Sequence, residues 1–357
     1  MPRVTMRDIA EVVGVSVMTV SNAFNRPDQL SPGLRQRILD RATKMGYSGP
    51  DAAARHLRSG RTNCYGVVFS EKLSYAFSDP FASVWLTAFT QVMEQHHASV
   101  LLLSVPASDA AAAVRDASID GLAGLCQDVV ATRQARDRGL PTVVCSFDED
   151  REPPGGYVII DDYEAGMDVA AHLKRLGHKR ISLLVEDAQL AGGPAQVSET
   201  DLRALRGGAR RAGRVERVQR ISGLLDGLAD VSLKLFVAGP NSRASGRRAA
   251  AEILDTSQRP TAVICTSDIL ALGFADACAE RGLAVGADVS VVGFDDIPEA
   301  AQAGLTTIHQ PVADKGRLAA ELLLDPDREP RRIVLPHRLV VRSSTQPVPQ
   351  PARPITD

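Results

Sequence analysis

The sequence predicts an α/β protein with a three-helix helix-turn-helix head at its N-terminal end, a hinge helix, and a two-lobed body with parallel sheets. Three observations predict this class. Residues 5–46 show short helical periods around a glycine, residues beyond Cys64 alternate apolar strands with amphipathic helices, and positive charge gathers at one end. We expect the head at 1–48, a hinge helix and linker at 49–62, the two-lobed body at 63–345 and a disordered tail at 346–357.

The first helix of the head is predicted to begin after Thr5. Thr5 can cap it, and Asp8 three residues later completes a capping box. Ile9, Ala10 and Val13 then form an apolar stripe, so this helix is expected to pack on a small core.

The second helix follows the turn at Gly14 and is predicted to be capped by Ser16. Its spacing directs three side chains inward, namely Val20, Ala23 and Phe24. Three others face outward, namely Val17, Met18 and Asn22. A third helix begins at Ser31-Pro32, with a serine cap before proline, and ends at Gly46.

Two short helices around a glycine turn are the arrangement that places one helix in the major groove of DNA. Val17 and Met18 offer apolar contact to a thymine methyl group, and the Asn22 amide matches the donor and acceptor of adenine. Phosphate contacts are expected from five polar side chains, namely Ser16, Thr19, Ser21, Asn25 and Ser31. Capping is their alternative role, and for Ser16 and Ser31 we expect both. A small helical bundle without DNA binding is the alternative for the whole pattern.

The charge distribution favours the DNA-binding interpretation. Residues 1–61 hold ten Lys and Arg against five Asp and Glu, so this stretch carries +5. The whole chain is −2, which leaves −7 on the remainder. Phosphate binding is therefore expected of the head alone.

The body is predicted to contain parallel sheets with helices on both faces, because strands and helices alternate over some 280 residues. The strand candidates are 66–69, 100–103, 121–125, 142–145, 181–185, 233–237, 262–265 and 289–292. The helix candidates include 82–96, 164–176, 247–254 and 269–281. Eight or more strands favour two lobes, and ligands in such folds bind at the carboxyl ends of strands and in the cleft between lobes.

Composition excludes several other classes. No apolar run approaches the roughly 20 residues of a membrane span, and the first residues lack a signal-peptide core, so we expect a cytoplasmic protein. The five cysteines form no CxxC pair, which indicates reduced thiols without zinc or disulfides. The sequence has no GxSxG, GxxxxGK[ST] or HExxH motif, and no GxGxxG follows the first strand. We therefore expect no enzyme, no metal and no cofactor.

Six sets of motifs lie in order along almost the whole chain. They are Met6 to Ala10 with Thr19 to Ser21, Ala53 to Thr62, Leu176 to Arg180, Arg259 to Ala262 with Ser267 to Gly273, Val289 to Asp296, and Leu305 to Ile308. Through these motifs the chain resembles the LacI/GalR family of bacterial transcriptional repressors. The resemblance implies a periplasmic-binding-protein-like body, a homodimer, double-stranded operator DNA as partner and a small-molecule effector, with no membrane association.

The resemblance also implies a hinge that contacts the minor groove through Ala54 and Leu57, with Leu57 as the wedge. The alanine-rich stretch 51–57 is too short for a stable isolated helix, so it would fold only on DNA. An ordinary linker is the alternative. Residues 48–50 make the spacing one residue longer than in the best-known members of the family, which leaves the hinge register open.

The effector pocket is expected at the carboxyl ends of strands, where five polar residues lie, namely Ser70, Ser146, Asp148, Ser267 and Asp295. Asp295 is the strongest candidate for hydrogen bonds to ligand hydroxyls, and capping of the next turn is its alternative role. The resemblance adds Asn241 as a pocket wall and an arginine, Arg203 or Arg206, although residues 201–208 depart from the family's Arg-x-x-Gly-aromatic spacing.

The sequence thus predicts a homodimeric repressor whose DNA affinity responds to a small neutral ligand, a sugar. A solute-binding protein of the same two-lobed type is one alternative, and it would have a signal peptide and no basic head. An enzyme with a fused regulatory head is the other. The proline-rich tail, 346–354, excludes the helical bundle that makes some relatives tetramers.

Overall fold

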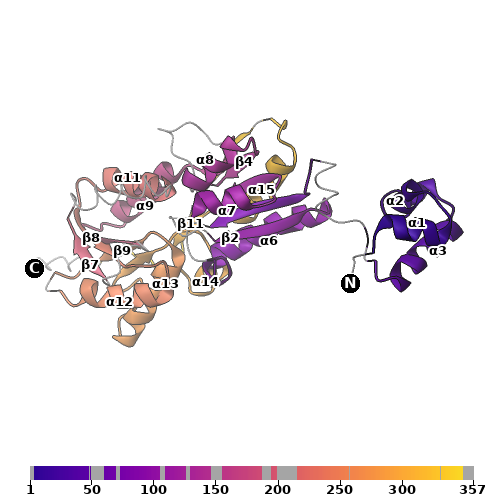
Figure 1. The fold of residues 1–357 in the computed structure, drawn as a ribbon. Coiled ribbons are helices and arrows are strands. Elements are labelled where there is room, and N and C mark those ends of the chain that lie inside the picture. The colour runs from indigo at the N-terminus through magenta and orange to yellow at the C-terminus, as the bar shows by residue number, and fades with distance from the viewer. Residues whose placement is uncertain are drawn as a thin grey trace, which may run out of the picture. The chain divides into compact units, whose positions relative to one another are not determined.

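The structure is a computed structural model that describes residues 4–47, 49, 60–69, 73–104, 109–125, 129–145, 155–186, 194–198, 215–256, 258–329 and 331–348. The chain divides into two compact units, Met1–Thr62 and Asn63–Asp357, and each is described here by itself (Figure 1).

The first unit begins with α1 (Met6–Val13), and the predicted capping box is confirmed. The Asp8 N–H donates to Thr5 Oγ1 at 3.4 Å, and Asp8 Oδ2 accepts from the Thr5 N–H at 2.8 Å. Gly14 ends the helix with φ 75°, a left-handed conformation that glycine adopts without strain.

Two further helices complete this unit, α2 (Val17–Asn25) and α3 (Pro32–Lys44), with the 3-10 turn η1 (Pro27–Gln29) between them. Ser16 caps α2 as predicted, because its Oγ accepts from the Thr19 N–H at 3.0 Å. The three helices share one apolar core made of Ile9, Ala10, Val20, Ala23, Ile38 and Ala42.

The prediction for Ser31 is wrong in one respect. Ser31 occupies the N-cap position of α3, but its side chain makes no capping hydrogen bond. Pro32 at the first helical position already has the φ that a helix requires, so the helix begins there without a side-chain cap.

The second unit contains two α/β lobes. The first lobe has a six-stranded sheet in the order β12-β5-β4-β3-β1-β2, in which every pairing is parallel. Its strands are β1 (Cys64–Phe69), β2 (Ser99–Ser104), β3 (Gly121–Gly124), β4 (Thr142–Val144), β5 (Gly156–Ile160) and β12 (Arg332–Leu335). Its helices are α5 (Tyr75–Ser78), α6 (Pro80–Gln95), α7 (Ala110–Asp116), α8 (Val129–Asp137) and α15 (Val312–Leu324).

The helices cover both faces of this sheet, as the sequence predicts. One face packs on α6 and α15, which lie side by side in Figure 1, and the other on α7 and α8. The α6–α15 contact is close, since a Cβ on Gly316 would lie 2.3 Å from the carbonyl oxygen of Trp85.

The second lobe has a five-stranded sheet in the order β10-β9-β6-β8-β7, parallel except for the edge strand β7. Its strands are β6 (Arg180–Val185), β7 (Ala195–Val197), β8 (Ser232–Val237), β9 (Ala262–Cys265) and β10 (Ser290–Val292). Its helices are α9 (Asp162–Arg175), α11 (Val215–Gly227), α12 (Arg243–Leu254), α13 (Asp268–Glu280) and α14 (Pro298–Gln302). Two apolar clusters form on this sheet, one with α9 and α11 and one with α12 and α13.

The chain passes between the lobes at three places. It leaves the first lobe after β5, returns between β11 (Thr307–His309) and α15, and leaves again between β12 and β13 (Arg338–Val340). β11 and β13 pair antiparallel, and β11 is bridged to the end of β10. Residues that follow β11 are therefore placed to link the lobes.

All eight predicted strands of the body are confirmed to within about two residues, as are the four predicted helices to within about four. Five further strands, β5, β7, β11, β12 and β13, were not predicted.

The prediction of a disordered tail is wrong for residues 346–348. The carbonyl oxygen of Gln346 lies 3.1 Å from Nε2 of His178, and the Val348 N–H donates to the Leu176 oxygen at 2.9 Å. Residues 346–348 thus belong to the second lobe, because its loops supply partners for their backbone groups. Residues 349–357 lie outside the described residues.

Candidate DNA-binding face and effector site

The predicted base-contacting residues lie on the outer side of α2. Val17 is 44% exposed and Met18 is 70% exposed, although both are apolar. Two exposed apolar side chains at the start of a short helix are unfavourable in water and suit a partner that covers them. Apolar contact with thymine methyl groups in a major groove provides such a partner.

Asn22 is also on α2, one turn beyond Met18, and it is partly buried. Its Nδ2 donates to Oε1 of Gln29 in the η1 turn at 3.3 Å. The hydrogen bond restrains the amide, and sequence reasoning missed Gln29 because a contact across seven residues leaves no local pattern.

The five predicted phosphate contacts form two pairs and one separate residue. Ser16 and Thr19 share a 2.8 Å hydrogen bond between their hydroxyls at the N-terminus of α2. Asn25 donates to the Ser21 hydroxyl at 3.3 Å and to its carbonyl oxygen at 3.0 Å. Ser31 lies apart, at the start of α3. The Ser16–Thr19 pair is the best placed for an anion, since it lies where the helix dipole is positive.

Seven predicted site residues lie outside the described residues. They are the hinge residues Ala54 and Leu57 and the effector candidates Ser70, Ser146, Asp148, Arg203 and Arg206.

The structure brings Asn241 and Ser267 together at the helical N-termini of the second lobe. Ser267 caps α13 and donates from Oγ to Oδ1 of Asn241 at 2.6 Å. Nδ2 of Asn241 donates in turn to Oδ2 of Asp79 at 3.1 Å. Asp79 belongs to the first lobe, where Oδ1 accepts from the Phe81 and Ala82 N–H groups at the start of α6. One carboxylate therefore caps a helix of one lobe and binds an amide of the other.

Asp295 lies immediately beyond β10, in a backbone conformation that ordinary residues rarely adopt. Its φ is 125°, and that of Asp296 is 57°. Asp296 is held by Nη2 of Arg342 at 2.6 Å and lies 2.8 Å from Nδ1 of His309. Strained backbone of this kind persists where neighbouring contacts fix it, and it concentrates at binding sites.

Electrostatics single out the Asp295 carboxyl group. Burial raises its pKa well above the usual range for aspartate, and the Arg220 guanidinium opposes that rise. The carboxylates of Asp268, Asp79 and Glu186 raise the pKa further. A carboxyl group in such surroundings is a candidate for ligand recognition.

Arg220 is the arginine that the structure places nearest to Asp295, and sequence reasoning missed it. It lies on α11, stacks 3.3 Å from the ring centroid of Phe294, and binds Oδ1 of Asp162 through Nε at 3.1 Å and Nη2 at 2.9 Å. Burial lowers its pKa, but Asp162 and the other nearby carboxylates more than offset this, so the net shift is upward.

The signal for this arginine is present in the sequence. Arg220 and Gly223 have the Arg-x-x-Gly spacing that was sought at 201–208, with Leu224 in the aromatic position. Gly223 is required by packing, since a Cβ there would lie 2.0 Å from the Tyr163 carbonyl oxygen in α9. The candidate arginine is thus displaced along the chain by the long segment after β6.

Asp268, the first residue of α13, supports the loop that carries Asp295. Its Oδ1 accepts from the Thr307 hydroxyl at 2.6 Å, and its Oδ2 accepts from the Ile297 N–H at 2.9 Å. Burial raises the pKa of Asp268 to about 7, against the effect of these hydrogen bonds.

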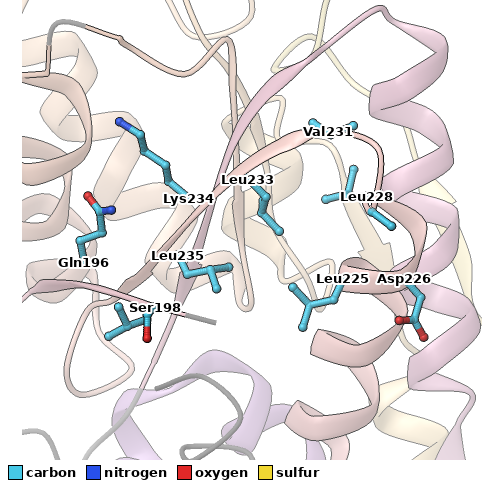
Figure 2. A pocket seen from close by; sticks show the side chains of 11 residues that line it. Gln196, Ser198, Leu225, Asp226, Leu228, Val231, Leu233, Lys234 and Leu235 are labelled. Carbon is cyan, nitrogen blue, oxygen red and sulfur yellow. The ribbon is translucent and has the colours of Figure 1, made fainter. Parts of the chain in front are cut away.

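A groove of about 850 Å³ lies elsewhere, at the outer edge of the second sheet (Figure 2). Side chains from β7, β8 and the end of α11 line it, among them Gln196, Leu225 and Leu233. None of the three described effector candidates, Asn241, Ser267 and Asp295, lines this groove. Within the part of the chain that the structure describes, no three His, Cys, Asp or Glu side chains are arranged to hold a metal ion. The described helices also include none long and apolar enough to cross a membrane.

Comparison with known proteins adds independent findings. Residues 5–49 match the bacterial regulatory proteins of the lacI family, and residues 170–345 match the periplasmic binding protein-like domain. An HTH-type transcriptional regulator of Mycobacterium tuberculosis is 37% identical over 338 residues, which cover 91% of this chain and 92% of that relative.

Two solved structures have the same fold. The lac repressor bound to ONPG superposes with a TM-score of 0.73 at 25% identity, covering 96% of this chain and all of that chain. A complex of the transcriptional regulator CelR with cellobiose gives a TM-score of 0.63 at 25% identity, with the same coverage.

Proposed function

Because this chain belongs to the LacI family of bacterial transcriptional regulators, we propose that two copies bind a pseudo-palindromic operator as a homodimer and repress transcription. DNA affinity is modulated by a small molecule, a sugar, bound in the second unit. The chain is a regulator and not an enzyme. Its relatives are likewise transcriptional regulators.

The observation that carries the DNA-binding proposal is the outer side of α2. It combines exposed Val17 and Met18 with the polar pairs at Ser16–Thr19 and Ser21–Asn25, within a stretch that carries +5. Apolar and amide side chains select bases, while hydroxyls and positive charge fix the position on phosphates. We propose that Ala54 and Leu57 add contacts in the minor groove, with Leu57 inserted between base pairs.

The effector proposal rests on Asp295 and its neighbours. The charges that shift the pKa of Asp295 most are three carboxylates and the guanidinium of Arg220, which is already paired with Asp162. An anionic ligand would be repelled by such a site, whereas hydroxyl groups can donate to carboxylates and accept from amides. The related CelR–cellobiose complex supports a sugar as the class.

The homodimer is supported by apolar side chains left exposed in the first lobe. Phe77 on α5 is 67% exposed and Val84 on α6 is 37% exposed. The Ser83 hydroxyl donates to the Ala76 oxygen at 3.1 Å, which holds the two helices together beside these side chains. An exposed apolar face of this kind suits contact with a second copy.

Binding-site selection from random duplex DNA with the full-length protein tests the proposal. We expect a two-fold symmetric sequence, bound with an affinity that falls steeply with salt because phosphate contacts release counterions. Selection that returns random sequence would refute operator recognition.

A further inference from the structure

Gln310 lies where the chain returns from the second lobe to the first, directly after β11 and two residues before α15. It is 3% exposed. The backbone just before it is fixed, because the Asp295 N–H donates to the Ile308 oxygen at 2.9 Å and Asp295 is bridged to His309. The Gln310 side chain is thus held beside the candidate effector residue.

The Gln310 amide has a different partner on each side. Nε2 donates to Oδ1 of Asp295 at 2.8 Å, and Oε1 accepts from Nζ of Lys315 at 2.7 Å. Asp295 belongs to the second lobe and Lys315 to α15 in the first. The carboxyl acceptor on one side and the ammonium donor on the other therefore fix the orientation of the amide, which joins Asp295 and Lys315 across the lobes.

Lys315 is a buried lysine, 3% exposed, and among the described residues no carboxylate lies within ion-pair distance of it. Burial of an ammonium group is costly without compensation. Among the described residues, the side-chain partner of this ammonium group is Oε1 of Gln310, whose amide in turn donates to Asp295. Any group that takes over Asp295 Oδ1 consequently changes the electrostatic environment of Lys315.

The first lobe is tightly packed at the Lys315 end of this connection. The Cys145 thiol lies 4.0 Å from the Lys315 carbonyl oxygen and 3.1 Å from Nε1 of Trp85, which donates to it. The next residue, Gly316, contacts the Trp85 carbonyl so closely that a Cβ would overlap it. A displacement at the start of α15 therefore reaches α6, the helix that carries Val84.

We propose that Gln310 is a positioning residue that couples Asp295 in the second lobe to Lys315, α15 and α6 in the first. An effector that binds Asp295 acts on the first lobe by displacing this amide. The inference rests on the proposed function for the role of Asp295 as effector ligand, and it supplies the path by which occupancy reaches α6.

Hydrogen exchange of backbone amides in the free full-length protein tests the coupling without operator or effector. Asp295→Ala removes the acceptor for Gln310, so exchange in the first turns of α15 and α6 is expected to rise at least about fivefold. In a Gln310→Met background the same Asp295→Ala change is expected to have no further effect on α6, because the connection is already broken.

Two matched variants serve as controls. Asp288→Ala removes a carboxylate of the same lobe that accepts from the Ala284 N–H, and Gln302→Met alters an exposed glutamine of α14. Neither is expected to change exchange in α6. If Gln310→Met loses its near-ultraviolet circular dichroism, Gln310→Glu replaces it, because glutamate keeps an acceptor for Lys315 and loses the donor to Asp295.

The coupling is refuted if Asp295→Ala leaves α6 exchange unchanged, or if its effect is the same with and without Gln310. Either result leaves operator selection untouched. Conversely, failure of operator selection leaves the exchange result standing, so the two proposals fail separately.

Discussion

Asp162 and Arg220 form a buried ion pair between the first residue of α9 and the middle of α11. Nη2 of Arg220 lies 2.9 Å from Oδ1 of Asp162, and both side chains are less than 10% exposed. The guanidinium also donates to the Thr266 carbonyl oxygen and stacks on Phe294. The guanidinium of Arg220 therefore already has protein partners. Its contacts hold Asp162, Phe294 and the Thr266 backbone together beside Asp295.

Arg220→Met is expected to lower the free energy of unfolding by about 3–5 kcal/mol, because it leaves Asp162 buried without its partner. Asp162→Leu combined with Arg220→Met is expected to recover part of that loss, since the buried Asp162 charge is removed together with the guanidinium that it pairs with. Urea unfolding of the single and double variants measures both. Arg243→Met is the control, because its ion pair with Asp276 is largely exposed and should contribute less than about 1 kcal/mol. Equal losses in the single and double variants would contradict the account.

The contribution of Asp268 to stability is expected to fall as pH rises from about 4 to about 7. The pKa of Asp268 is raised from 3.8 to about 7, so the folded state retains this proton over a range in which the unfolded state loses it. The raised pKa of Asp295 acts in the same direction. Burial lowers the pKa of His172 and of His178, and these two groups act in the opposite direction, because the unfolded chain then binds the protons. We expect Asp268 by itself to make the protein less stable at pH 8 than at pH 5 by about 2 kcal/mol.

Urea unfolding at the two pH values measures this difference. Asp268→Asn is expected to remove much of the pH dependence, whatever its effect on absolute stability. Asp288→Asn, at an exposed position, should leave it unchanged. An equal change in stability between pH 5 and pH 8 for wild type and Asp268→Asn would show that Asp268 does not titrate as described.

The organisation of this chain could largely be predicted from its sequence where the signals are local. Thr5 with Asp8, Gly14 and Ser16 act within four residues of their partners, and the structure confirms each role. Length does not explain which strands escaped prediction, because β4 and β10 also have three residues and were predicted. β11 and β13 form by pairing with each other, and β12 forms by pairing with β5, in each case with a segment distant in the sequence.

Side-chain contacts between distant segments also escaped prediction. The hydrogen bond from Asn241 to Asp79 joins residues 162 positions apart, and nothing in either local pattern indicates it. Arg220 was missed because its Arg-x-x-Gly motif follows an unusually long segment and lacks the aromatic residue. In both cases the fold determines which side chains meet.

Asn22→Ala is expected to relax base preference at one position of each half-site, at a cost of about 1–3 kcal/mol in operator binding. The Asn22 amide is restrained by Gln29, so Gln29→Ala should weaken binding less and leave the selected sequence unchanged. Repeating binding-site selection with each variant distinguishes the two effects. An unchanged selected sequence for Asn22→Ala would remove this residue from base recognition.

Val84→Asp is expected to convert a dimer into a monomer, since it places a charge on the apolar face formed by α5 and the start of α6. Sedimentation or light scattering at micromolar concentration measures the mass. Val130→Asp on α8 is the matched control, because Val130 is more exposed, at 47%, and lies on the opposite face of the sheet. The proposed interface would be contradicted if the wild-type protein were a monomer or a tetramer. It would also be contradicted if the Val84→Asp variant remained a dimer.

Asp295→Ala is expected to abolish the response to effector while leaving the selected operator sequence unchanged, because the carboxylate belongs to the second unit and the base contacts to the first. A thermal-shift screen of sugars, with cellobiose and ribose among them, identifies a ligand. Calorimetry then compares the affinity of that ligand for wild type, Asp295→Ala and the control Asp288→Ala.

By reciprocity, operator DNA must change effector affinity by the same factor as effector changes operator affinity, typically corresponding to about 1–3 kcal/mol. Undiminished affinity in Asp295→Ala would remove this residue from the site. A screen in which only phosphorylated or carboxylated compounds bind would refute the neutral sugar, since the carboxylates around Asp295 should repel such ligands.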